Sequence, residues 1–128
     1  MGVTGIDHLV LYATDVERTC EFYAETLGVA RVEEFGADRV ALSFGEAKLN
    51  VHPAGDEYEP HAATPTPGAA DFCLVVDEPV KALAERFADA GVDLVEGPVA
   101  RTGARGEMRS VYVRDPDGNL VEFARYDD

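Results

Sequence analysis

Five polar residues with chemically active side chains stand beside apolar neighbours in stretches that alternate like β-strands. They are His8, Asn50, His52, Asp71 and Glu122. Successive side chains of a strand point to opposite faces, so these residues point away from the face that carries their apolar neighbours. Imidazole, amide and carboxylate groups can bind polar ligands, coordinate metals or transfer protons. The sequence therefore predicts a chemically active face opposite the core face of each strand.

The segment that carries His8 opens a first structural unit. A strand-like run over residues 5–15 leads into a helix signal, in which Thr14 and Glu17 have the spacing of a capping box. Apolar residues then recur at helical intervals up to Gly28, a typical left-handed cap, which predicts a helix over residues 16–27. Three β-like runs follow, at 30–35, 39–44 and 47–52. Residues 4–52 are therefore predicted to form a β-α-β-β-β unit.

The same order recurs in the second half of the chain. Residues 53–68 carry four of the seven prolines and are predicted to be a connector. A strand over 69–76 precedes a helix that opens near Pro79 and closes at Gly91. Further strands are predicted at 93–96, 108–114 and 120–126, with a turn over 115–118. Residues 69–126 thus form a second unit. We predict one α+β domain over residues 1–128, whose two βαβββ modules form curved mixed sheets around a shared cavity.

Composition limits the partners. The chain has 25 acidic and 11 basic residues and a net charge of −14, which disfavours nucleic acid and anionic membranes. This charge either serves solubility or attracts a cationic ligand. No apolar run approaches a membrane span and no export signal opens the chain, so we expect a cytoplasmic protein. Cys20 and Cys73 lie in apolar patterns and are expected to be buried, unpaired thiols.

Two motifs resemble a known family. The opening Asp7-His8-Leu9-Val10-Leu11 and the ending from Tyr112 to Glu122 resemble the first and last signatures of the vicinal oxygen chelate superfamily. Residues 48–52 and 96–104 are similar to its virulence-protein-like glyoxalase-domain branch. The resemblance covers nearly the whole chain, and it implies the glyoxalase/bleomycin resistance/dioxygenase fold.

The resemblance also implies a metal site. It places ligands at His8, Asn50, Asp71 and Glu122, although Asp71 stands where histidine is usual and Asn50 where a carboxylate or similar donor is usual. His52 shares a face with Asn50 and is the alternative ligand, which leaves Asn50 to contact the substrate. The ligands are then His8, His52, Asp71 and Glu122, a set that suits Zn, Ni, Fe or Mn. Glu122 or Asp71 is also the expected proton shuttle.

Further residues are candidates for substrate binding. Arg101, Arg105 and Arg109 surround small and flexible residues, and they either meet an anionic substrate at the cavity mouth or remain solvated loop charges. Tyr112 either faces the cavity or packs in the core.

Two functions remain open at this stage. The first is a metal-dependent lyase, isomerase or dioxygenase that acts on a small oxygen-chelating substrate. The second is a metal-free protein that sequesters a small molecule, as bleomycin-resistance members of the superfamily do. Curved sheets with open strand edges favour a homodimer. In such a dimer we expect His8 and Glu122 to face one cavity, which different chains can share.

Overall fold

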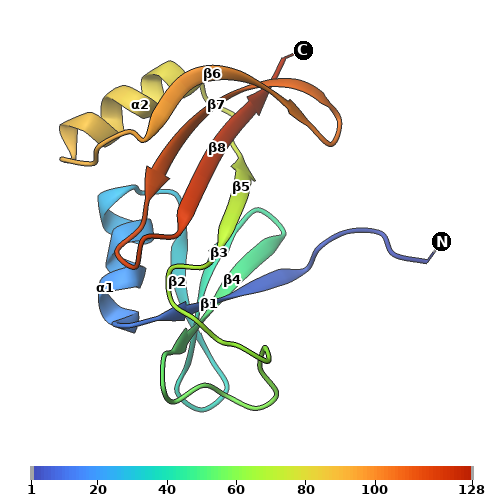
Figure 1. The fold of residues 1–128 in the computed structure, drawn as a ribbon, viewed down its shortest axis with the longest axis vertical. Helices are drawn as coiled ribbons and strands as arrows, with labels where there is room; N and C mark the ends of the chain where they lie inside the picture. Colours follow the sequence, from blue (N-terminus) through green and yellow to red (C-terminus); the bar gives the residue numbers. More distant parts are fainter. Residues whose placement is uncertain (1, 128) are drawn as a thin grey trace. The chain divides into compact units, whose positions relative to one another are not determined.

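The computed structural model describes residues 2–127 and divides the chain into two compact units, residues 1–68 and 69–128. Each unit contains one four-stranded sheet and one helical segment that lies against the sheet (Figure 1). The β-α-β-β-β order that the sequence predicts twice is confirmed in both units, and the fold class is α+β. In the described part of the chain, no helix is long and apolar enough to cross a membrane.

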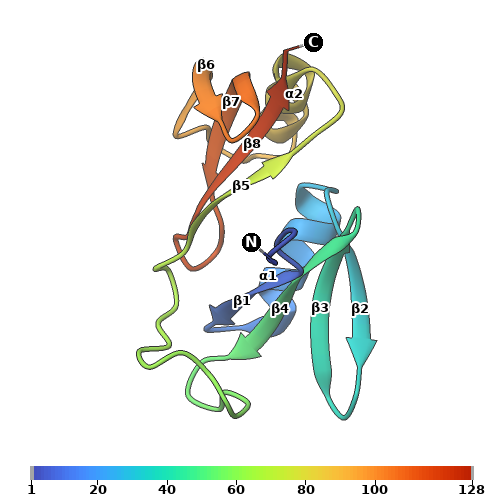
Figure 2. The same ribbon diagram turned by 90° about the vertical axis from the view of Figure 1, so that its right-hand side faces the viewer.

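The first sheet has the strand order β1-β4-β3-β2, in which β1 and β4 are parallel and the other pairs are antiparallel. Figure 2 shows β2 and β3 as a long hairpin at one edge of this sheet. Tyr23 and Leu27 of the helical segment are buried, as are Leu42, Leu49 and Val51 of the sheet. The elements are β1 (His8–Ala13), α1 (Val16–Glu21), η1 (Phe22–Thr26), β2 (Arg31–Phe35), β3 (Arg39–Phe44) and β4 (Ala47–Pro53).

The helix predicted over residues 16–27 is present over residues 16–26, but its second half is not α-helical. The chain changes from the α-helix α1 to the π-helix η1, where the Leu27 N–H donates to the carbonyl of Phe22, five residues earlier. The cap also differs, because Asp15 rather than Thr14 accepts from the Arg18 N–H. Gly28 does adopt the predicted left-handed conformation, with φ of 65°.

The second sheet repeats this arrangement, with the order β5-β8-β7-β6 and a parallel β5–β8 pair. Leu83 and Phe87 of its helix are buried, and the Phe87 and Phe123 rings meet edge to face at 5.2 Å. Val111 and Val121 complete the buried face of the sheet. The elements are β5 (Asp71–Val75), α2 (Val80–Asp89), β6 (Glu96–Gly103), β7 (Gly106–Arg114) and β8 (Leu120–Tyr126).

Strand β6 corrects two predictions. A strand was predicted at residues 93–96 and a flexible basic patch around residues 101–109, but residues 96–103 form a strand that pairs with β7. A register shift between Glu96 and Val99 accompanies Gly97, whose φ is +110°. A Cβ atom at position 97 would lie 2.5 Å from the Ser110 carbonyl oxygen, so only glycine fits there.

The connector between the units, residues 54–70, contains no helix or strand. Two tyrosine hydroxyls take part in the hydrogen bonds that join it to the first unit. The Tyr58 hydroxyl donates to the Asp38 carbonyl at 2.7 Å, and the Ala62 N–H donates to the Tyr12 hydroxyl at 2.9 Å. The predicted connector, residues 53–68, overlaps this segment except at Pro53, which ends β4, and no local pattern indicated its contacts with Tyr12 and Asp38.

Candidate functional site

A pocket of about 390 Å³ lies on the face of the second sheet opposite the buried core face. On this face one residue of each strand pairs in register with the next across the sheet, in the order Cys73, Glu122, Tyr112 and Glu96. Four residues that the sequence singled out therefore line one pocket: Asp71, Arg101, Tyr112 and Glu122. Their roles stay predictions, but their common location is a property of the second unit alone.

Glu122 is half-buried and held in place. The Ser110 hydroxyl donates a hydrogen bond of 2.6 Å to its Oε2 atom, and Ser110 itself has no exposed surface. A charge-assisted bond of this length restricts the carboxylate to one orientation. Sequence reasoning missed Ser110, although its parity with Tyr112 on one strand was a usable signal.

Arg101 is fixed beside Glu122 by two partners. Its Nε atom donates to the Tyr112 hydroxyl at 2.9 Å, and a terminal nitrogen donates to Glu96 at 2.6 Å. Desolvation and the Glu122 carboxylate raise the pKa of Tyr112, while the Arg101 guanidinium acts in the opposite direction. Tyr112 therefore remains a protonated hydrogen-bond donor near neutral pH. It faces this pocket and not the core.

The start of β5, which carries Asp71, is fixed by the turn between β7 and β8. Asn119 Oδ1 accepts from the Ala70 N–H at 2.9 Å, and Asn119 Nδ2 donates to Asp115 Oδ2 at 2.7 Å. Asp115 Oδ1 also accepts from the backbone of Asp117 and Asn119. The sequence indicated the turn but not that it holds the residue before Asp71.

Cys73 departs from the prediction of a buried thiol, because the residue is exposed, whereas Cys20 is buried and both are free. Cys73 lies directly opposite Glu122 across the β5–β8 pair. Desolvation of the sulfur and the Glu122 carboxylate raise the pKa of Cys73 to about 12. The thiol is therefore unsuited to nucleophilic chemistry near neutral pH.

In the first unit, His8 and Asn50 occupy neighbouring strands. The His8 side chain is partly exposed and its Nδ1 atom lies 2.8 Å from Asp7 Oδ1. Asn50 pairs with Val10, two residues after His8, so both side chains lie on one face. The Oδ1 atom of Asn50 is buried and has no hydrogen-bond partner among the described residues.

His52 does not share a position with His8. It pairs with Tyr12 while His8 pairs with Lys48, four residues earlier on the same two strands. Four residues of a strand span about 13 Å, and two nitrogens bound to one ion must lie within about 4 Å of each other. This separation disfavours the two imidazoles of one first unit as ligands of one ion, and the ligand set of His8, His52, Asp71 and Glu122 remains a prediction.

The surroundings of His52 are those of a packed residue. It is only 8% exposed, and the rings of Tyr12 and Tyr58 meet it edge to face at 5.7 and 5.0 Å. Its Nδ1 atom has no partner among residues 2–127. Burial lowers the pKa of His52, and the charges of Arg39 and His61 lower it further.

The two units repeat one arrangement of donors. On β1, His8 lies two residues before Val10, which pairs with Asn50 of β4. On β5, Asp71 lies two residues before Cys73, which pairs with Glu122 of β8. The pairs His8/Asn50 and Asp71/Glu122 therefore hold equivalent positions. No group of three His, Cys, Asp or Glu side chains placed to hold an ion occurs within the described residues.

Arg109 is not brought to this site. It pairs with Ala100 and Arg125, and it lines a different pocket, on the helix-bearing face of the second sheet. Arg105 lies in the β6–β7 turn, where its guanidinium stands over the Tyr126 ring at 4.3 Å. Of the three arginines in the predicted basic patch, only Arg101 lines the pocket of Glu122.

The repeated βαβββ units and their matching polar positions define a domain of the glyoxalase type. Residues 5–123 match the family model of the Glyoxalase/Bleomycin resistance protein/Dioxygenase superfamily, and the chain belongs to this family.

Similar proteins cover almost all of the chain. Virulence protein STM3117 of Salmonella typhimurium is 48% identical over 98% of this chain and 87% of its own length. The crystal structure of the Salmonella protein aligns with 99% of the present chain over 100% of the crystallised chain, with 46% sequence identity and a TM-score of 0.95. Glyoxalase domain-containing protein RDO1 of Mycosarcoma maydis is 44% identical over 100% of this chain and 72% of its own length. An integron cassette protein from the mobile metagenome of V. cholerae is 44% identical over 99% of this chain and 98% of that chain, with a TM-score of 0.95.

Proposed function

We propose that this protein is a metal-dependent enzyme of the superfamily that acts on a small substrate with neighbouring oxygen atoms, as a glyoxalase-like lyase or isomerase or as a dioxygenase. The observation that carries the proposal is the repeated donor arrangement, His8/Asn50 in the first unit and Asp71/Glu122 in the second. The duplicated register places two polar donors at equivalent positions of each unit, on the sheet face opposite the core, where a ligand can reach them.

The donor set fits a divalent cation. The buried Asn50 Oδ1 atom lacks a partner, and an unsatisfied buried acceptor costs about 1–3 kcal/mol, which a bound ligand or water relieves. Asp7 binds His8 at Nδ1, which leaves Nε2 as the ligating atom, the usual arrangement of a carboxylate behind a metal-bound histidine. The proposed ligands are thus His8, Asn50, Asp71 and Glu122, one nitrogen and three oxygen donors suited to Mn, Fe, Ni or Zn. When bound, such an ion polarises substrate oxygens as a Lewis acid.

The residues of the second unit supply the remaining chemistry. In the proposed reaction Glu122, whose orientation is restricted by Ser110, is the expected proton acceptor, and Asp71 in the same pocket is the alternative acceptor. The Tyr112 hydroxyl and the Arg101 guanidinium stand beside them and stabilise negative charge that develops on a substrate oxygen.

Metal analysis and calorimetry test the proposal. Protein purified without chelator is analysed for bound transition metals, and then stripped protein is titrated with Mn²⁺, Ni²⁺ and Zn²⁺. We expect about one bound metal ion per chain. The affinity for the metal should be at least tenfold lower in Glu122→Gln and Asp71→Asn. His52→Gln is the matched control and should retain the wild-type affinity. Equal affinity in wild type and Glu122→Gln contradicts the proposal.

One observation favours a second function, metal-free sequestration of a cationic small molecule. The chain carries a net charge of −14, and three carboxylates, Asp71, Glu96 and Glu122, line the same pocket against one arginine. The family to which the chain belongs includes bleomycin resistance proteins by name. Under this alternative, stripped protein binds a cationic drug such as bleomycin with an affinity that chelator does not change.

A further inference from the structure

A second pocket of the second unit, also about 390 Å³, lies on the other face of the sheet. Arg109 and Arg125 line it from β7 and β8, and these positions have the parity of the core residues Val111 and Phe123. Ser110 and Glu122, by contrast, point to the opposite face. The pocket is therefore separate from the candidate site described above.

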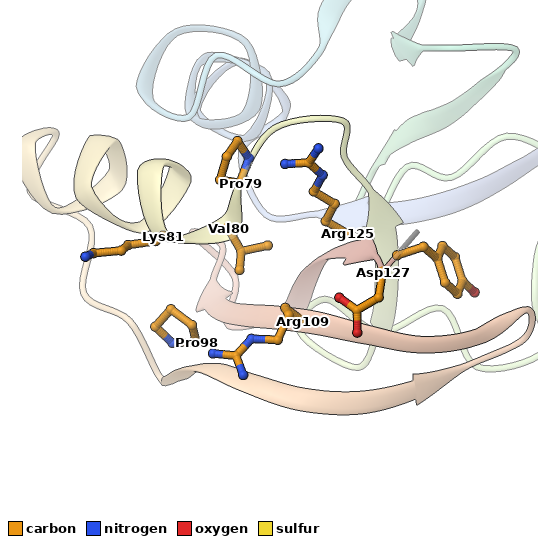
Figure 3. Close-up of a pocket in the computed structure, with 8 residues that line it drawn as sticks. Pro79, Val80, Lys81, Pro98, Arg109, Arg125 and Asp127 are labelled. Carbon is orange, nitrogen blue, oxygen red and sulfur yellow. The ribbon is translucent and has the colours of Figure 1, made fainter.

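The charged residues that line this pocket are mostly basic, although the chain as a whole is acidic. Three of the 11 basic residues, Lys81, Arg109 and Arg125, line it together with a single acid, Asp127. Figure 3 shows Arg109 extending toward Pro98 and Arg125 extending toward Pro79, with Val80 between them. The chain has more than twice as many acids as bases, so this local excess of positive charge is not the average composition of its surface.

Each of the three cations occupies a position where a positive charge is locally unfavourable. Arg109 and Arg125 are directly opposed across the β7–β8 pair, where like charges are destabilising. Lys81 stands in the first turn of α2, at the positive end of the helix dipole, and that turn contains no acidic residue. Within residues 2–127 none of the three forms an ion pair, whereas Arg86 and Arg101 are paired with Glu78 and Glu96. Functional sites are where such breaches of local rules, without an evident compensating contact, are expected.

We infer that this pocket binds the phosphate group of a small organic phosphate. Guanidinium groups hold phosphate oxygens through paired N–H donors, and a lysine adds a point charge. Pro79, Val80 and Pro98 supply apolar surface for the organic part of the ligand. Because these residues are independent of His8, Asn50, Asp71 and Glu122, the inference stands whether or not the proposed metal site exists.

Calorimetric titration in the presence of chelator tests the inference. The probes are phenyl phosphate, which has an apolar body, and inorganic pyrophosphate, which has none, with sodium chloride to match ionic strength. We expect saturable binding of phenyl phosphate, weaker binding of pyrophosphate, and an affinity at least tenfold lower in Arg109→Gln and Arg125→Gln. Asp127→Asn should bind more tightly because it removes the negative charge that opposes the ligand.

Arg114→Gln is the matched control, because Arg114 is exposed on the same strand but does not line the pocket. It should bind phenyl phosphate as the wild type does. The urea midpoint of Arg109→Gln should rise slightly, since one of two opposed charges is gone, which also shows that the variant is folded. The absence of saturable binding to the wild type at millimolar phenyl phosphate, or an equal loss in Arg114→Gln, overturns the inference.

Discussion

The hydroxyl of Ser110 donates a hydrogen bond of 2.6 Å to the carboxylate of Glu122, from a position with no solvent exposure. The two residues lie on the adjacent strands β7 and β8, offset by two residues, because Ser110 pairs with Ala124 and Glu122 pairs with Tyr112. The hydroxyl therefore reaches the carboxylate diagonally across the open face of the sheet and fixes its direction.

Replacing Ser110 by alanine should weaken the proposed metal site while preserving the fold. Loss of a partner behind a ligand typically lowers metal affinity by about 10- to 100-fold. Calorimetric titration with Mn²⁺ or Zn²⁺ measures this change. Thr102→Ala is the control, because it removes a similar hydroxyl–carboxylate bond, of 2.9 Å to Glu107, outside the pocket. Equal affinities in Ser110→Ala and wild type would show that the bond serves only the fold.

The thiol of Cys73 should react slowly despite its exposure. Its pKa is raised from 9.0 to about 12, so the folded chain holds far less thiolate at pH 8 than the unfolded chain. In a Cys20→Ala background, which removes the other thiol, we expect alkylation by iodoacetamide to be at least tenfold slower in native protein than in urea. Adding Glu122→Gln should accelerate the native reaction, because the carboxylate raises this pKa. Equal native and unfolded rates contradict the prediction.

The same shift gives a direction to the pH dependence of stability. The pKa of Cys73 is higher in the folded chain than in the unfolded chain, so the unfolded chain loses this proton first as the pH rises. The contribution of the protonated thiol to the free energy of unfolding is therefore complete below pH 9 and decreases as the pH rises toward 12. The urea midpoint should therefore fall less between pH 8.5 and pH 10.5 in Cys73→Ala than in wild type. An identical fall in both proteins would assign the alkaline loss to other groups, among them Tyr112, whose pKa is also raised.

Asn119→Ala should destabilise the second unit. The substitution removes the acceptor of the Ala70 N–H and the donor to Asp115, which is itself buried. Leaving such groups unsatisfied costs about 1–3 kcal/mol each. Urea unfolding monitored by circular dichroism measures the loss, and the exposed Asp93→Ala serves as control. A midpoint for Asn119→Ala equal to that of the control would mean that the turn does not hold the start of β5.

A homodimer is the remaining prediction. Strands β1 and β2 are the edges of one sheet and β5 and β6 the edges of the other, and Leu9, Val32 and Val75 on these edges are exposed. Exposed strand edges with apolar side chains favour pairing with a second chain. Light scattering at micromolar concentration should give about twice the 13.8 kDa monomer mass. Val32→Lys or Val75→Lys should shift the mass toward the monomer, and a monomeric wild type contradicts the prediction.

Local pattern alone determined most of the elements. The strands at residues 39–44 and 120–126 have the predicted bounds, because alternation of side chains is a property of the extended backbone itself. The same alternation separated Asn50 and Glu122 from their apolar neighbours, so the polar face of each sheet was predictable. The switch to a π-helix at Phe22 was not, since the same apolar spacing fits either helix over one turn.

The tertiary structure decided which polar residues meet. Register set His8 two residues from the position opposite Asn50 and four residues, about 13 Å along the strand, from the position opposite His52. It also turned Arg101 and Arg109 to opposite faces of one hairpin. Parity within a strand says which residues share a face but not which residue of a neighbouring strand stands opposite. The register between strands depends on turn geometry and on pairing between segments far apart in the chain. The hydrogen bond from the Ala70 N–H to the Asn119 side chain is an example of such a contact. The residue types of the site were therefore encoded locally, whereas their assembly into pairs was fixed only by the packed sheets.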